Sequence, residues 1–355
     1  MNSPAADAAT YLGLAAARAR AGDHRAALEA VDQALQLQPR NLRALIVKAD
    51  QLAAIGDGRS AASFYRAAVQ AAPAPQEMPA ELRDEVARAA ALSSRYAAAF
   101  ETHLGQQLAA RQLDDPGSRF SESLDILSGR KQVYFQEPRH YFFPGLPQLQ
   151  FYPREAFPWL DALEAATDEI RAELVEVMKE DAAFKPYLER NARLPHTDAH
   201  GLFENPAWSA FYLWKHGELV AENAARCPRT VAAMREVPFA AVRNRSPSVI
   251  FSLLLPGAHI PPHTGEVNTR LVCHLPLIVP QKCHLRVGNE TRPVVEGKAW
   301  VFDDTIEHEA WNGSDRTRVI LLFEVWRPEL TERERAQVRA MFEAIDAYGG
   351  ASPSG

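Results

Sequence analysis

The sequence contains few cysteines, and they are not arranged in pairs. Cys227, Cys273 and Cys283 are odd in number and show no C-x-x-C spacing. A disulfide framework uses an even number of cysteines, and a thiolate zinc site needs closely spaced ones. Neither feature is indicated, so three reduced thiols are expected.

The sequence also lacks an excess of basic residues. Lys and Arg number 39 against 45 Asp and Glu, which gives a formal net charge of -6. A protein that neutralises a phosphate backbone needs a basic stripe, and none is available here. Nucleic acid is therefore not expected as a partner.

Long apolar runs are absent as well. The N-terminal segment MNSPAADAAT has neither the basic region nor the continuous apolar core of a signal peptide. No later stretch reaches about 18 uninterrupted apolar residues, the length that a membrane helix requires. We therefore expect a soluble, cytoplasmic protein without a membrane segment.

The sequence is long enough for two folded domains, and the first is marked by an internal repeat. The chain has 355 residues, a length that indicates two domains with cores of their own. Residues 9 to 73 repeat themselves at an offset of 34, the period of tetratricopeptide repeats. Alanines allow two helices to pack closely, a Gly-Asp pair turns the chain, and a proline ends the second helix. The matched positions are Ala15/Ala49, Gly22/Gly56, Asp23/Asp57, Ala27/Ala61, Ala34/Ala68 and Pro39/Pro73.

Two such repeats cannot bury their faces alone, so we expect the helical stretch at 79–113 to continue the stack. The alternative is a plain alanine-rich helical bundle. In either case we expect residues 1–113 to form a helical binding or docking module for a protein partner. We expect it to have no chemistry of its own, because nothing in it resembles a nucleophile with its base.

The second domain is predicted to span residues 114–355. Between 114 and 150 the composition changes to Gly, Pro and aromatic residues, as at a domain boundary. Residues 157–181 have the apolar spacing of an amphipathic helix. Short β-rich runs follow, and they predict a sandwich or jelly-roll barrel within an α+β multidomain chain. These runs are 249–255, 269–279, 284–287, 299–302 and 319–325.

Histidines concentrate among these strands. Five of them lie within 50 residues, and neutral imidazole is the commonest metal ligand in proteins. His259 and His263 are four apart, as in helical zinc motifs, but the two prolines between them exclude a regular helix. His263 directly precedes one predicted strand and His308 follows another, so two histidines on facing strands can bind one iron. The five are His259, His263, His274, His284 and His308.

An arginine completes the constellation. Alternation places Arg270, Val272 and His274 on one face of their strand. Arg318 lies ten residues after His308, beyond an Asn-Gly turn, on a mostly apolar face. Its guanidinium needs a carboxylate there, and the distal carboxylate of a 2-oxoacid supplies one with bidentate geometry. The alternative is an internal pairing of Arg318 with Glu324 or a nearby Asp.

Together these motifs resemble the aspartyl/asparaginyl β-hydroxylases, and the similarity spans residues 133 to 331. The resemblance implies a double-stranded β-helix that uses iron(II) and 2-oxoglutarate. It is carried by PGAHIPPHTG at 256–265, NTRL at 268–271, HL at 274–275, GK at 297–298, FDD at 302–304, EHE at 307–309, Trp311, Arg318, VWRPEL at 325–330 and YFFPGLP at 141–147.

The resemblance also implies residue roles. His263 and His308 are the expected iron ligands, and the expected 2-oxoglutarate-binding residues are Arg318, His274 and Ser252. Arg270 is expected to point toward the substrate. Two departures are visible: Gly265 stands where most such oxygenases carry a ligating carboxylate, and Val272 stands where the animal enzymes carry another arginine. The resembled family shares the first departure, so water is expected to fill that position.

The implied reaction is hydroxylation of an unactivated carbon with dioxygen, and the β-carbon of an Asp or Asn residue in a peptide or protein is the favoured target. Alternatives are an oxygenase for a lipid acyl chain or a small amino acid, and a non-catalytic metal-binding scaffold.

The sequence also contains an alternative ligand pair and several polar residues that are not expected to bind the metal. His196-Thr197-Asp198 spells the His-x-carboxylate pattern, but a loop follows it, which favours a polar loop near the substrate entrance. His200 and His284 are expected to be solvated or hydrogen-bonded instead of ligating. Asp303 and Asp304 are expected to orient ligands or to cap a turn.

Overall fold

The computed structural model describes residues 7–113, 115–180, 183–188 and 203–348. The chain divides into two compact units, Met1–Lys131 and Gln132–Gly355. The division falls later than the predicted boundary at 113/114, because one further helix belongs to the first unit. Among the described residues, no helix is long and apolar enough to cross a membrane.

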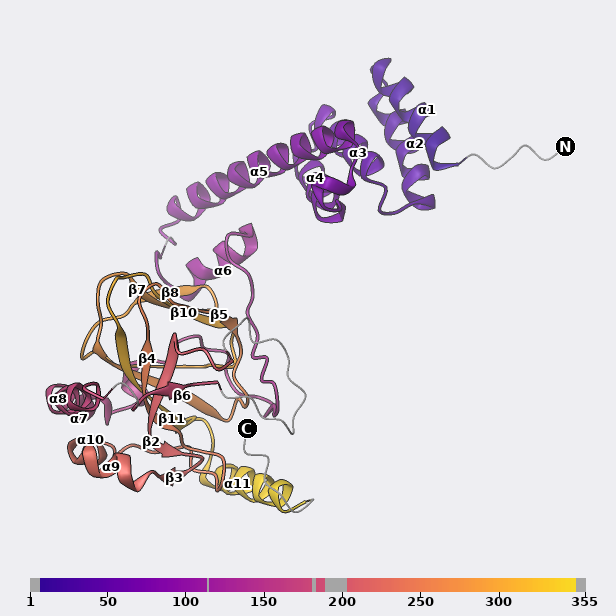
Figure 1. The fold of residues 1–355 in the computed structure, drawn as a ribbon. Coiled ribbons are helices and arrows are strands. Elements are labelled where there is room, and N and C mark those ends of the chain that lie inside the picture. Colours follow the sequence, from indigo (N-terminus) through magenta and orange to yellow (C-terminus); the bar gives the residue numbers. More distant parts are fainter. Residues whose placement is uncertain (1–6, 114, 181–182, 189–202, 349–355) are drawn as a thin grey trace. The chain divides into compact units, whose positions relative to one another are not determined.

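The first unit is helical, as predicted, and its helices follow the sequence repeat (Figure 1). Gly22 and Gly56 adopt the left-handed conformation that ends a helix, with φ of 78° and 85°. Asp23 and Asp57 then cap the following helices by accepting a backbone N–H. The helices are α1 (Ala8–Arg20), α2 (His24–Leu37), α3 (Leu42–Ala54), α4 (Gly58–Ala71), α5 (Ala80–Ala109) and α6 (Arg119–Ser128), with a 3-10 turn at Pro75–Glu77.

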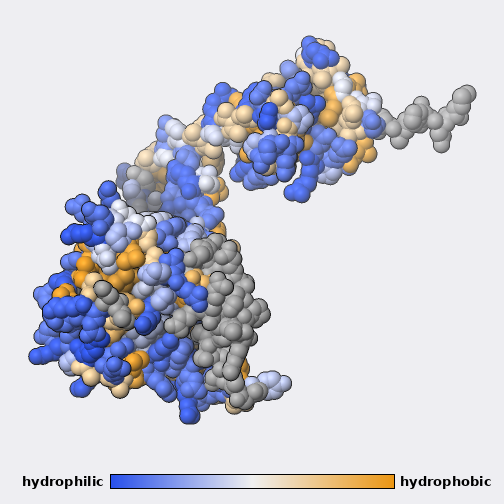
Figure 2. Space-filling view, in the orientation of Figure 1, coloured by the Kyte–Doolittle hydropathy of each residue, from blue (hydrophilic) through white to orange (hydrophobic). Residues whose placement is uncertain are grey.

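Small side chains let these helices pack closely. The repeated alanines, among them Ala15 and Ala49, are fully buried, and Val31 and Tyr65 fill the larger apolar position between the pairs. The predicted helix at 79–113 is α5, which packs on α4 and α3. Arg88 of α5 donates to both carboxylate oxygens of Asp50 in α3, at 2.9 and 2.8 Å. The visible face of this unit is mainly hydrophilic, with apolar residues interspersed (Figure 2).

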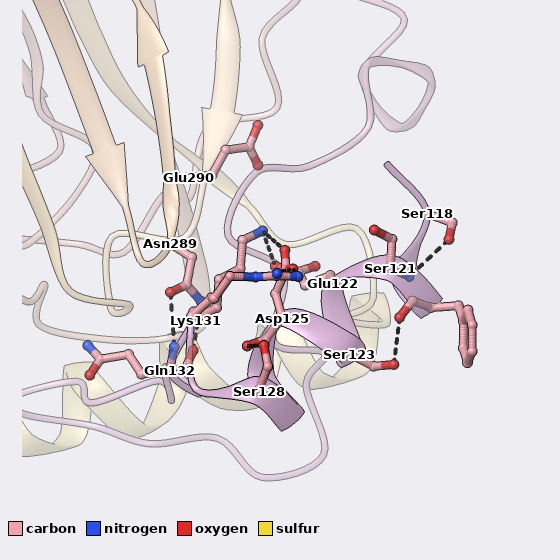
Figure 3. A network of polar contacts seen from close by, with 12 residues as sticks. Ser118, Ser121, Glu122, Ser123, Asp125, Ser128, Lys131, Gln132, Asn289 and Glu290 are labelled. Carbon is pink, nitrogen blue, oxygen red and sulfur yellow. Dashed lines mark hydrogen bonds and ion pairs between the residues drawn. The ribbon is translucent and has the colours of Figure 1, made fainter. Parts of the chain in front are cut away.

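Helix α6 closes the first unit (Figure 3). The Ser121 backbone N–H donates to the Ser118 side chain at 3.1 Å, which caps the first turn. After the helix, Lys131 donates to Glu122 at 3.3 Å. A serine cap within a loop-like composition explains why the sequence pattern did not reveal this helix.

The second unit is built on two antiparallel sheets. The larger has the order β1-β2-β4-β11-β6-β9, with β3 paired to β2, and the smaller has the order β5-β10-β7-β8. Their facing surfaces share one apolar cluster, which includes Leu254 and Phe302 from the larger sheet and Leu285 from the smaller. This arrangement is the predicted jelly-roll type. The strands are β1 (Lys185–Pro186), β2 (Trp208–Lys215), β3 (Glu218–Leu219), β4 (Val249–Leu254), β5 (His259–His263), β6 (Arg270–Ile278), β7 (Cys283–Val287), β8 (Glu290–Pro293), β9 (Trp300–Phe302), β10 (His308–Asn312) and β11 (Arg318–Trp326).

Helices cover the outer face of the larger sheet (Figure 1). The helix predicted at 157–181 is split into α7 and α8 at Ala166. Leu271, Cys273 and Leu275 of β6 point toward these helices, so Arg270, Val272 and His274 face the smaller sheet, as alternation predicted. The helices of this unit are α7 (Leu160–Ala165), α8 (Thr167–Val177), α9 (Ala221–Arg226), α10 (Pro228–Ala233) and α11 (Glu332–Ala347), with a 3-10 turn at Arg154–Ala156.

Candidate active site

The two candidate ligands, His263 and His308, lie side by side on neighbouring strands of the smaller sheet. His263 ends β5 and His308 begins β10, and the two residues are register partners in antiparallel strands. Their ring centroids are 4.1 Å apart. As predicted, His263 precedes the strand at Arg270–Ile278 and His308 follows the strand at Trp300–Phe302, but the two histidines lie on neighbouring strands of one sheet and not on facing strands. The prolines of HIPPH do not prevent a strand, because β5 is an edge strand.

Both imidazoles are prepared to ligate a metal through the same atom. His263 Nδ1 lies 2.8 Å from the Pro261 carbonyl oxygen, and His308 Nδ1 lies 3.1 Å from that of Ile306. A carbonyl can only accept, so each Nδ1 carries the proton and each Nε2 keeps its lone pair. Burial lowers the pKa of His263 and, more strongly, that of His308. Both rings are therefore neutral at neutral pH, the form that binds metals.

Among the described residues, no carboxylate joins the two histidines as a third ligand. Within the described residues, no three His, Cys, Asp or Glu side chains are grouped so that they could hold a metal ion. The space beside Gly265 is filled by Asp304, because a Cβ built at Gly265 would overlap the Asp304 carboxylate and approach Oδ1 to 2.8 Å. Asp304 is buried, and burial raises its pKa to about 7. The rival His196-Thr197-Asp198 and His200 lie outside the described residues.

Gly265→Ala is therefore expected to destabilise the second unit by about 1–3 kcal/mol, the usual cost of overpacking a tight site. The comparison is Gly313→Ala, where a Cβ would approach the Lys282 carbonyl oxygen only to 3.1 Å. Chemical denaturation of the two variants measures the difference. An unchanged free energy of unfolding in Gly265→Ala would show that Asp304 yields easily to a side chain at 265.

Arg318 is a buried cation of the larger sheet. It is 2% exposed, and its Nε and Nη2 atoms have no hydrogen-bond partner among the residues described. Burial lowers its pKa to about 10, so the guanidinium remains positive at neutral pH. The internal pairing weighed above does not form, because Glu324 binds Arg270 instead, at 2.7 Å.

Two further polar groups gather near Arg318. His274 is buried, and its Nδ1 has no hydrogen-bond partner in the described part of the chain. Its pKa is well below the usual range because of burial and the charge of Arg318. Ser252 lies on β4, two residues before Leu254, the register partner of Arg318. Its Oγ accepts from Trp208 Nε1 at 3.1 Å. The structure thus brings together His263, His308, His274, Ser252 and Arg318, while Arg270 is engaged by Glu324.

A buried polar network, which the sequence patterns did not reveal, supports the loops that carry the histidines. The Asp303 side chain accepts from Gln136 Nε2 at 2.8 Å and also binds Arg327. Gln136 in turn accepts from Asn268 Nδ2 at 2.9 Å. Asp303 Oδ1 accepts from the Thr305 backbone N–H at 3.1 Å, which caps the turn before His308. Asp303 therefore takes one of the two roles expected for it.

Two further histidines, His259 and His284, lie on the outer face of the smaller sheet. His259 stacks on Trp311 with ring centroids 5.2 Å apart, and its Nε2 lies 2.9 Å from Glu309. His284 is a register partner of Trp311 on the neighbouring strand. Trp311 is three residues after His308, so alternation points it away from the face that carries His308. His259 is paired with Trp311 because the register between β5 and β10 shifts between His308 and Ala310.

Comparison with known proteins agrees with this site. Residues 164–328 match the family model described as aspartyl/asparaginyl beta-hydroxylase. An ornithine lipid ester-linked acyl 2-hydroxylase of Rhizobium tropici is 35% identical over 50% of this chain and 60% of its own length. The aspartyl/asparaginyl beta-hydroxylase of Homo sapiens is 37% identical over 43% of this chain and 22% of its own. The match thus covers less than two thirds of either relative.

Similarity to solved structures is weak. KdgF from Halomonas sp. aligns over 39% of this chain and 94% of its own, with 14% identity and a TM-score of 0.23, which is too low to support an assignment. The family match does not depend on it, since residues 164–328 include both paired histidines and Arg318. Residues 164–328 of the second unit are thus similar to the aspartyl/asparaginyl β-hydroxylases.

Proposed function

We propose that the second unit is an iron(II)- and 2-oxoglutarate-dependent dioxygenase that hydroxylates an unactivated carbon. The observation that carries the proposal is the pairing of two neutral histidines with an unpaired buried arginine on the facing sheet. Two imidazoles suit iron and leave positions open for other ligands. A buried guanidinium without a carboxylate calls for an anionic ligand.

The residues present fit both groups. His263 and His308 would hold iron(II) through their Nε2 atoms, because the Nδ1 of each ring faces a backbone carbonyl. Arg318 would bind the distal carboxylate of 2-oxoglutarate, with hydrogen bonds from Ser252 and His274. When bound, iron and 2-oxoglutarate supply the activation of dioxygen, in which one oxygen atom enters a C–H bond and 2-oxoglutarate is oxidised to succinate and carbon dioxide.

The chain itself contributes orientation and exclusion of water. The Nδ1 hydrogen bonds to Pro261 and Ile306 fix the tautomer and ring plane of both histidines. Phe302 packs edge-on against His274 and His308, with ring centroids 4.9 and 5.5 Å apart. An apolar wall of this kind keeps water from the reacting groups.

The favoured substrate is an Asp or Asn residue of a peptide or protein, hydroxylated at the β-carbon. The name of the human relative supports it. An acyl chain is the second candidate, because the Rhizobium relative is named as a lipid acyl hydroxylase. For the first unit we propose tetratricopeptide-type repeats that dock a protein partner, supported by the 34-residue offset of its capped helices. We also propose that the protein is located in the cytoplasm.

Succinate formation from 2-oxoglutarate tests the function. The full chain should form succinate only with iron(II), and one substrate class should stimulate it while gaining one oxygen atom by mass spectrometry. The arms are peptides that contain Asp, peptides that contain Asn, and an acylated lipid. Stimulation by the lipid alone would replace the peptide assignment. Absence of succinate in every arm, with iron bound, would favour the non-catalytic scaffold.

A further inference from the structure

We propose that Glu324 and Asp304 make the substrate end of the barrel select an uncharged carboxamide over a carboxylate beside the reacting carbon. The proposal rests on the function above and narrows its substrate to an asparaginyl-type side chain.

The first observation is that Arg270, the residue expected to face the substrate, already has a carboxylate partner. Arg270 Nη1 lies 2.7 Å from Glu324 Oε1, and both side chains are at least 85% buried. Glu324 Oε2 accepts from the Ser248 backbone N–H at 2.8 Å, which fixes the carboxylate in place. Burial alone would lower the pKa of Arg270, but the charges of Glu324 and Asp304 raise it. The cation is thus balanced within the protein.

Arg270 and Arg318 differ in whether a carboxylate of the described residues pairs with them. Both arginines face the smaller sheet, from neighbouring strands β6 and β11. No carboxylate of the described residues lies within ion-pair distance of Arg318, whereas Arg270 has Glu324. Only one of the two therefore requires an anion from a ligand. Val272, the register partner of Glu324, adds no second positive charge at this end.

The second observation is a pair of buried atoms without partners. In the part of the chain that the structure describes, Arg270 Nε is a donor with no acceptor and Asp304 Oδ1 is an acceptor with no donor. The two residues interact electrostatically. A primary amide matches both, because its oxygen accepts and its NH2 group donates.

A carboxylate would fit poorly in the same place. It can only accept, so it would leave Asp304 Oδ1 unpaired whenever Asp304 is ionised, whereas an amide can pair with either form of Asp304, whose pKa is about 7. It would also add a negative charge near Asp304 and Glu324, with Glu266 interacting with both. Like charges at short range in a buried site cost several kcal/mol, so charge and hydrogen bonding favour the amide.

The test measures the affinity of two small probes, N-acetyl-L-asparagine methylamide and N-acetyl-L-aspartate methylamide. The full chain is loaded with iron(II) and 2-oxoglutarate without oxygen, and binding is followed by calorimetry. We expect the wild type to bind the asparagine probe roughly tenfold tighter or more. Glu324→Gln keeps the size and an acceptor for Ser248 but frees the charge of Arg270, so the aspartate probe should become the tighter one.

Glu309→Gln is the matched control. Glu309 is a mostly buried carboxylate paired with Arg286 on the outer face of the smaller sheet, so its loss should leave the ratio of affinities unchanged. Equal binding of the probes by the wild type, binding of neither, or an unchanged ratio in Glu324→Gln would overturn the proposal. If iron and 2-oxoglutarate themselves fail to bind, the proposed function fails first, and the specificity inference fails with it.

Discussion

Replacing Arg318 by alanine is expected to weaken 2-oxoglutarate binding by roughly 30-fold or more, because truncating one partner of a buried ion pair typically costs 2–5 kcal/mol. Affinity for iron(II) should change little, since the arginine approaches the cosubstrate and not the metal. Arg318→Lys keeps the charge but loses the planar fork, so a loss of about tenfold is expected. Titration of 2-oxoglutarate against each variant, with metal present, measures both.

Replacement of Arg318 is expected to raise the stability of the protein, although it weakens 2-oxoglutarate binding. A buried guanidinium without a partner costs folding free energy, and an apolar side chain of similar size removes that cost. Arg318→Met should therefore unfold at a higher denaturant concentration than the wild type when no 2-oxoglutarate is present. Arg316→Ala is the control, because Arg316 is exposed two residues away. Unchanged 2-oxoglutarate affinity in Arg318→Ala would remove the cosubstrate assignment.

His308→Ala should abolish stoichiometric metal binding while leaving the fold intact, and His263→Ala should do the same. Loss of a direct ligand costs more than the roughly 10- to 100-fold that loss of an outer hydrogen-bonding partner costs. Because no third side chain in the described residues completes the site, either deletion leaves a single imidazole. Binding of Mn(II), followed by its magnetic resonance signal, reports affinity without turnover.

His284→Ala is the matched control for both variants. His284 is a partly exposed histidine of the same sheet, on strand β7 beside β10, and should not affect metal affinity. Metal binding that survives in both His308→Ala and His263→Ala would place the ion elsewhere, whether or not His284→Ala loses it.

Much of this architecture could be predicted because it is local in the sequence. Gly-Asp pairs separated by 34 residues end one helix and cap the next, so they mark helical hairpins from sequence alone. Alternation assigned the faces of β6 correctly, since a strand has a period of two. The five predicted strands agree with the observed ones to within a residue or so at each end.

The remaining features depend on residues far apart in the chain. Asn268 and Gln136 are 132 residues apart, and Gln136 and Asp303 are 167 apart, so no local pattern reports their hydrogen bonds. The sequence showed that Gly265 lacks a carboxylate, but only the structure shows Asp304 in the space beside it. Likewise, the choice of Arg270 over Arg318 as the partner of Glu324 follows from strand pairing between β6 and β11.

Anaerobic titration of the full chain, first with iron(II) and then with 2-oxoglutarate, tests the central claim most directly. The account predicts one iron and one 2-oxoglutarate per chain, with the visible absorption that 2-oxoglutarate gives on binding to protein-held iron(II). The absorption should be lost in His308→Ala and should require far more 2-oxoglutarate in Arg318→Ala. Iron binding that 2-oxoglutarate does not alter, or 2-oxoglutarate binding that ignores both substitutions, would contradict the account.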